Sequence, residues 1–225
     1  MCNLLKILKQ LGSKPKLKDM EVNDPEVVLP KQEDVMSKFL TEEDYQYAAS
    51  IIGCEVAVIK AVSFVESGGR SGFLKDGKTP KILFEGHWFH KLTKGRFTTP
   101  ENANISYPRW IRKYYNQDQH KRLQKAVELD RDAALKSASW GKFQIMGFNY
   151  KIAGYDTLQD FINAMYKNEV SQLVAFVNFV RHRRLDDDLR RLDWQGFAYG
   201  YNGAGYAQNK YDEKLEKAYL KYKSL

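Results

Sequence analysis

From Leu40 to the C-terminus, short segments with apolar residues at helical spacing follow one another, and several begin after a residue that caps helices. Thr41 precedes EEDYQYAASII, and Asp44, three positions later, completes a capping-box pattern in which Asp replaces the usual Glu or Gln. Gly53 ends this segment, and Thr157 and Asp193 stand before similar ones. The pattern predicts about seven or eight helices with little strand, and therefore a mainly α fold.

Two stretches depart from the helical pattern. KILFEGHWFHKLTKGRF, residues 81–97, mixes β-prone and aromatic residues and indicates either a short strand or a broken helix. SASWGKFQIMGFNY, residues 137–150, is interrupted by glycines. We therefore expect a small irregular or β-containing segment within the helical domain.

The first thirty residues differ from the rest of the chain. Their leucines and isoleucine at 4, 7, 8 and 11 form one helical stripe, and prolines at 15, 25 and 30 break any regular structure after it. We interpret residues 1–30 as an amphipathic arm and linker, and residues 31–225 as the main domain. The lysines of the arm fit contact with an anionic membrane. The alternative is an arm packed on the domain.

The charge of the chain indicates an anionic partner without identifying it. Thirty-six Lys and Arg residues against 28 Asp and Glu residues give a net charge of +8, which suits nucleic acid, phosphate-rich lipid or an acidic cell envelope. Two cysteines, Cys2 and Cys54, make no disulfide framework. Lys6 and Lys9 lie within the apolar part of the N-terminus, so we predict no secretory signal and synthesis in a cytoplasm.

The stretch VESGG places one acid, Glu66, at the end of an apolar helical run. Gly68 and Gly69 then let the backbone turn away, so the carboxyl is expected to face a cleft with apolar walls. Partial burial disfavours the charged form and raises the pKa. A carboxylic acid of raised pKa suits the protonation of a leaving oxygen near neutral pH. The alternative is an exposed acid in a loop.

Two glycine turns carry polar and aromatic residues. SWGKFQIM spans residues 139–146, and YGYNGAGY spans residues 199–206. Polar side chains on such turns suit an extended sugar chain, because the backbone can approach the hydroxyls closely, and tyrosine faces can stack on sugar rings. Either turn alone fits a structural loop equally well.

Together and in this order, VESGG, SASWGKFQIMGFN and GYNGAGYAQNKYDEKL resemble the N-acetylmuramidase domain of many phage endolysins. That family belongs to the lysozyme-like group, with goose-type lysozymes and soluble lytic transglycosylases. The resemblance runs from about residue 40 to residue 222 and is fairly specific, because three motifs recur in one order. Two positions depart from the family: Gly86 stands where arginine is common, and Lys142 where leucine is common.

The resemblance implies a lysozyme-like helical domain with the irregular segment beside a catalytic cleft. It implies cleavage of bacterial peptidoglycan between N-acetylmuramic acid and N-acetylglucosamine, without a cofactor, by a monomer acting on the wall in the envelope or periplasm. Glu66 would be the general acid. The residues expected to bind substrate are Ser67, Phe143, Gln144, Ile145, Tyr201 and Asn202.

Hydrolysis with inversion needs a second carboxylate, about 6.5–9.5 Å from the acid, to activate water. Glu85 is favoured, because it lies in an apolar stretch, where burying a charged group is costly and an acid is therefore unexpected without a role. Asp76 in KDGK is the second candidate, although a turn explains it as well. Lytic transglycosylases need no second acid, since the 6-hydroxyl of the sugar attacks. They remain the alternative.

Other readings are weaker. His87 and His90 lack the spacing of a zinc motif, so no metal is expected, and GGRSG is no phosphate loop. The acids 186–188 fit a solvated surface beside the arginines of 181–184. A non-catalytic binder of envelope or nucleic acid is the rival class. RWIRKYY, residues 109–115, is the best basic-aromatic stretch for nucleic acid, and we expect none to bind.

Overall fold

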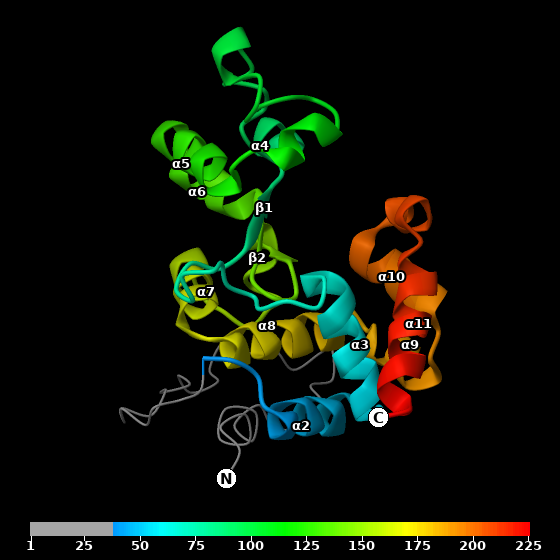
Figure 1. Ribbon diagram of the computed structural model, residues 1–225. Coiled ribbons are helices and arrows are strands. Elements are labelled where there is room, and N and C mark those ends of the chain that lie inside the picture. The colour runs from blue at the N-terminus through cyan, green and yellow to red at the C-terminus, as the bar shows by residue number, and fades with distance from the viewer. Residues whose placement is uncertain (1–37) are drawn as a thin grey trace, which may run out of the picture.

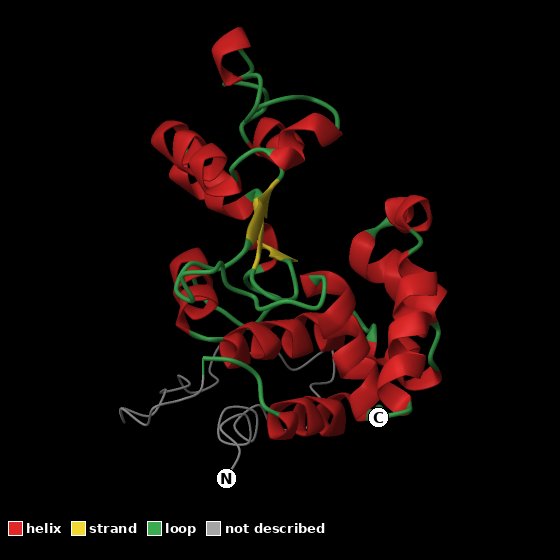
Figure 2. Ribbon diagram, viewed as in Figure 1, coloured by secondary structure: helices red, strands yellow, loops and turns green. Residues whose placement is uncertain are grey.

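The computed structural model describes residues 38–225, so the expected arm at residues 1–30 lies outside the described part of the chain. A central helix, α8, crosses the molecule, and α2 lies along it (Figure 1). α3 packs against α2 and α11, and α10 packs against α11. A second group of helices, α4 to α6, is joined to this body by a small sheet (Figure 2). The mainly α, lysozyme-like fold expected from the sequence is confirmed.

The described α-helices are α2 (Glu42–Ile52), α3 (Val56–Ser67), α4 (Gly86–Leu92), α5 (Gln119–Leu129), α6 (Arg131–Lys136), α7 (Leu158–Lys167), α8 (Glu169–His182), α9 (Asp186–Arg191), α10 (Trp194–Asn202) and α11 (Tyr211–Lys223). Four short 3-10 helices accompany them: η2 (Pro100–Asn102), η3 (Arg112–Asn116), η4 (Gly147–Asn149) and η5 (Ala204–Asn209).

The helix starts follow the cap residues of the sequence. The Thr41 hydroxyl accepts a hydrogen bond from the backbone N–H of Asp44, and the Asp44 carboxylate accepts one from the backbone N–H of Thr41. Thr157 and Asp193 cap α7 and α10 in the same way through one side-chain acceptor each. The capped helices are therefore predicted correctly, because the signals are local.

Both readings of residues 81–97 are correct in part. A three-residue strand, β1 (Ile82–Phe84), is followed at once by the short helix α4. β1 pairs antiparallel with β2 (Ala138–Trp140), which pairs antiparallel with β3 (Ile145–Met146). The pairing of Leu83 with Ser139 brings two stretches together that lie far apart in the sequence.

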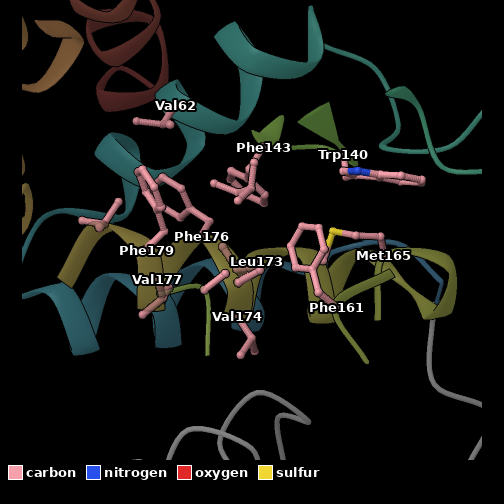
Figure 3. Packing of buried hydrophobic residues seen from close by; sticks show 14 of the residues in the cluster. Val62, Trp140, Phe143, Phe161, Met165, Leu173, Val174, Phe176, Val177 and Phe179 are labelled. Carbon is pink, nitrogen blue, oxygen red and sulfur yellow. The ribbon is translucent and has the colours of Figure 1, made fainter. Parts of the chain in front are cut away.

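The core gathers around α8, most of whose residues are buried. Figure 3 shows Phe143 from the glycine turn between α3 and the aromatic face of α8. Its ring stacks on Phe176 with a centroid distance of 4.6 Å. Full burial of one such side chain contributes roughly 1.5–3 kcal/mol. The turn after β2 is therefore anchored in the core rather than free on the surface.

The acids of 186–188 pair with arginines of their own helix. They begin a helix, α9, that the apolar pattern did not reveal, and their partners are Arg190 and Arg191 rather than the arginines of 181–184. Acids in the first turn and bases in the last complement the helix dipole and form pairs one turn apart.

Within residues 38–225 no single helix has the length and apolar composition to cross a membrane. In that part of the chain only α2 and α3 together meet the test, and they meet at a bend of 110°.

Candidate active site

Glu66 lies in the last turn of α3, and two glycines turn the chain away directly after it. Gly68 and Gly69 have φ angles of 63° and 71°, in the left-handed region that favours glycine. A Cβ at Gly69 would lie 2.6 Å from the Phe64 ring, so a larger residue does not fit there. The two glycines thus let the chain turn away from α3, and the half-buried Glu66 remains in the last turn of the helix.

Burial raises the pKa of Glu66 from 4.5 to about 8, and a hydrogen bond with the Asn202 side chain opposes this rise in part. The negative charge of Glu66 is the main cause that raises the pKa of Tyr211 to about 12. Burial, and then the same charge, raises the pKa of Tyr201. The acid expected from the sequence is therefore held protonated near neutral pH, among side chains of α10 and α11.

An open cavity of about 530 Å³ lies beside Glu66. Four parts of the fold form its wall: the end of α3 with the loop after it, strand β1 with the residue before it, the start of α5, and the glycine turn. The lining residues are Glu66, Ser67, Leu74, Lys81, Ile82, Leu83, Asp118, Gln119, His120, Gly141 and Gln144. Of the expected site residues, Glu66, Ser67 and Gln144 are brought together here.

Gln144 is held rigidly at the cavity wall. Its φ angle is 51°, an unusual left-handed value for a residue other than glycine. Its side-chain Oε1 accepts a hydrogen bond from the Ser139 hydroxyl at 2.7 Å, and its Nε2 donates to the Gly141 carbonyl oxygen at 2.8 Å. Backbone strain of this kind persists where the surroundings fix it, and often marks a functional position.

The expected substrate contacts of Phe143 and Ile145 need correction. Phe143 is fully buried and Ile145 is 3% exposed, so their side chains pack into the core instead of facing the cavity. Gln144, which stands between them in the sequence, lines the cavity. The two apolar neighbours anchor the turn.

Tyr201 and Asn202, at the end of α10, lie near Glu66 but are not among the residues that line the cavity. The Tyr201 ring packs among Phe176, Phe179 and Phe197, and its hydroxyl donates a hydrogen bond to the Phe143 carbonyl oxygen at 2.6 Å. Asn202 is exposed and reaches Glu66. Tyr201 thus supports the site, whereas Asn202 can meet a ligand.

A buried carboxylate that the sequence analysis missed holds the loop after Glu66 and the glycine turn at residues 139–146. Glu169, 2% exposed at the start of α8, accepts hydrogen bonds from the Gly72 backbone N–H at 2.6 Å and from the Ser71 hydroxyl at 2.9 Å. Lys142 forms an ion pair with it at 3.3 Å. The lysine that departs from the family pattern is therefore the partner of this carboxylate, and only its distance in sequence from residue 169 concealed the pairing.

Glu85, the favoured second carboxylate, lies between β1 and α4 and is not among the residues that line the cavity. Its Oε2 accepts a hydrogen bond from the Tyr115 hydroxyl and lies 3.2 Å from His87 Nδ1. The glycine after it is required, because a Cβ at Gly86 would lie 2.4 Å from the Tyr107 ring. Arginine, common in the family at that position, would not fit.

Asp76 lies in an exposed turn and also is not among the lining residues. Hydrogen bonds from Thr79 and Lys78 lower its pKa to about 2. The lining includes one other carboxylate, Asp118, which caps α5 by accepting from the backbone N–H groups of His120 and Lys121 at 3.0 and 3.1 Å. A cap signal alone does not reveal that a side chain also faces a cavity.

Within residues 38–225, no group of three or more His, Cys, Asp or Glu side chains could hold a metal ion. His90 Nδ1 lies 2.7 Å from the Thr98 hydroxyl, and His87 lies beside Glu85. The two histidines of the sequence analysis thus have separate surroundings.

A glutamate of raised pKa, ending a core helix beside an open cavity and a small antiparallel sheet, is the arrangement of the lysozyme-like glycoside hydrolases. The family model of the N-acetylmuramidases matches residues 55–223, and the chain belongs to this family. It is a glycoside hydrolase that acts on peptidoglycan.

A solved structure agrees with this assignment. The fold is similar to that of the Burkholderia AP3 phage endolysin, with a TM-score of 0.73 and 37% sequence identity. The match covers 84% of this chain and 72% of that chain. No curated protein matched the sequence.

Proposed function

We propose that this protein cleaves the bond between N-acetylmuramic acid and N-acetylglucosamine in peptidoglycan, with Glu66 as the general acid. One observation carries the proposal: Glu66 lines the cavity and has its pKa raised to about 8 by burial. At neutral pH the carboxyl holds a proton that it can donate to the glycosidic oxygen. The Asn202 hydrogen bond stabilises the carboxylate that remains.

For the second carboxylate, the cavity favours Asp118 over the Glu85 and Asp76 of the sequence analysis. Asp118 lines the same cavity as Glu66. Its Oδ1 caps α5, and none of the hydrogen bonds in residues 38–225 uses its Oδ2. That oxygen is available to accept a proton from an attacking water, as an inverting hydrolase requires.

The alternative is a lytic transglycosylase. This alternative is supported by the fact that neither Glu85 nor Asp76 is among the residues that line the cavity. Attack by the muramic 6-hydroxyl needs only one protein acid, and Glu66 supplies it.

Mass spectrometry of the products released from purified peptidoglycan distinguishes hydrolysis from transglycosylation. Reducing muramic ends support hydrolysis, and 1,6-anhydro ends support transglycosylation. Glu66→Gln should fold normally and cleave at least about a hundredfold more slowly, because a positioned general acid contributes that much. Full activity of this variant, or products cut only at peptide bonds, would refute the proposal.

A further inference from the structure

Lys81 is a cation that lines the cavity, and it forms none of the ion pairs found among the described residues. It is half-buried and lines the cavity together with Glu66. None of the ion pairs or side-chain hydrogen bonds found in residues 38–225 involves its ammonium group. The nearby carboxylate, Glu169, is already held by Lys142 and the loop after Glu66.

The backbone of Lys81 fixes this position. Its N–H donates to the Gly72 carbonyl oxygen at 2.8 Å, and its carbonyl oxygen accepts from the Gly141 N–H at 2.8 Å. These bonds tie Lys81 to the loop after Glu66 and to the turn that carries Gln144. A side chain rooted between the two is placed in the cleft by the fold, unlike a surface lysine on a free loop.

A second cation strengthens the positive field. Arg70 is exposed, belongs to the loop after Glu66, and takes part in none of the ion pairs of the described residues. Burial lowers the pKa of Lys81, and the positive charges of Arg70 and Lys142 lower it further. A charge kept in such a place is stabilised when an anion binds.

The substrate offers one kind of anion near the scissile bond. The sugar rings of the glycan are neutral, whereas the lactyl arm of each muramic acid ends in a carboxylate or carries a peptide with carboxylates. Resting on the proposed function, we infer that Lys81, assisted by Arg70, binds a carboxylate borne on the lactyl arm and so selects muramic acid chains over neutral chitin-like ones.

The test compares Lys81→Met with Lys78→Met, which has the same net charge. Lys78→Met is the control, because Lys78 is exposed in the same loop and is not among the cavity-lining residues. Cleavage rates are measured on peptidoglycan, on peptidoglycan whose carboxylates are converted to methylamides, and on glycan stripped of peptides by an amidase. Lys81→Arg should restore activity, since it keeps the charge.

On native peptidoglycan, Lys81→Met should lower kcat/KM about tenfold, the effect of losing one charge-assisted hydrogen bond, and Lys78→Met should change it little. On the methylamidated substrate, wild type and Lys81→Met should be equal. On stripped glycan, a persisting loss identifies the lactyl carboxylate, and equal rates identify a carboxylate of the peptide. An equal loss on native and methylamidated substrate, or a loss no greater than that of Lys78→Met, would overturn the inference.

A binding measurement separates this inference from the proposed function. Glu66→Gln, with and without Lys81→Met, is pelleted with native and methylamidated walls. Weaker binding of the double variant to native walls alone supports the inference even if the products show another cleavage site. Equal binding of both variants to native walls contradicts it.

Discussion

The Tyr201 hydroxyl donates to the backbone carbonyl oxygen of Phe143 at 2.6 Å and so joins α10 to the turn that carries Gln144. Phe143 is buried, and the Tyr201 ring is enclosed by phenylalanines. One bond therefore connects the helix that ends at Asn202, beside Glu66, to the turn that carries Gln144.

Tyr201→Phe should destabilise the protein by about 1–3 kcal/mol, because it leaves a buried carbonyl without its partner. Denaturant unfolding measures this change. The cleavage rate of folded protein should fall as well, since the Gln144 turn loses one support. Tyr199→Phe, on the exposed face of α10, is the control and should change neither quantity. Unchanged stability of Tyr201→Phe would show that the bond is unimportant.

The pH dependence of the rate follows from Glu66. If the acid must be protonated, kcat/KM should fall as pH rises through about 8, tenfold per unit above it. Asn202→Ala removes the bond that lowers this pKa, so the fall should move to higher pH. A profile that stays flat to pH 10, or an Asn202→Ala profile displaced to lower pH, would contradict the assignment.

Stability should depend on pH through the same group. The folded pKa is about 8 against an ordinary 4.5, so the folded state keeps a proton that the unfolded chain releases between these values. Folding stability due to Glu66 is complete below pH 4.5 and is lost as pH rises through the folded pKa. Glu66→Gln removes the titration. The unfolding free energy of the variant relative to wild type should therefore rise from pH 5 to 8, by roughly 1.4 kcal/mol per pH unit at most. Melting temperatures of both proteins recorded across this range measure the trend.

The second carboxylate can be identified with three variants that preserve shape. Asp118→Asn keeps the helix cap, because asparagine caps as well as aspartate, so a loss of activity reports on charge and not on folding. We expect it to lose most hydrolysis, and Asp76→Asn to keep it. Glu85→Gln tests the residue favoured by the sequence. If Asp118→Asn stays active while Glu85→Gln is inactive, Glu85 and not Asp118 is the second carboxylate.

The arm at residues 1–30 remains a prediction. Its lysines and leucine stripe suit an anionic membrane, so its deletion should reduce binding to anionic liposomes and leave cleavage of purified peptidoglycan nearly intact. Flotation with liposomes and release of reducing or anhydro ends measure the two effects. Loss of cleavage on deletion would show that the arm belongs to the folded domain.

Most of the features that could be predicted are marked by residues close to them in the sequence. Thr41, Thr157 and Asp193 act within their own first turns, so the sequence shows them directly. Glu66 could be found because it stands near the end of an apolar helical run, two residues before Gly68 and Gly69. The pairing of β1 with β2 was not predictable from either strand, since each has only three residues.

The site residues that could not be predicted were missed for a common reason. Lys81, Asp118 and Glu169 each look ordinary in their own segment, and each gains its meaning from a partner or a cavity formed by distant segments. Phe143 and Ile145 were expected to bind substrate because they share with Gln144 the motif that resembles the family. Packing in the core, such as the stacking of Phe143 on Phe176, buries the side chains of Phe143 and Ile145. Gln144, between them, lines the cavity.

The backbone of Gln144 has a consequence for improving this protein. Its φ angle of 51° would suit glycine better than glutamine. A selection scored only by resistance to heat weighs this strain against the two hydrogen bonds of the Gln144 amide. It takes no account of the cavity that the same amide lines. Variants of position 144 therefore need to be ranked by cleavage of cell walls before they are ranked by melting temperature, because stabilising changes at a cavity often cost activity.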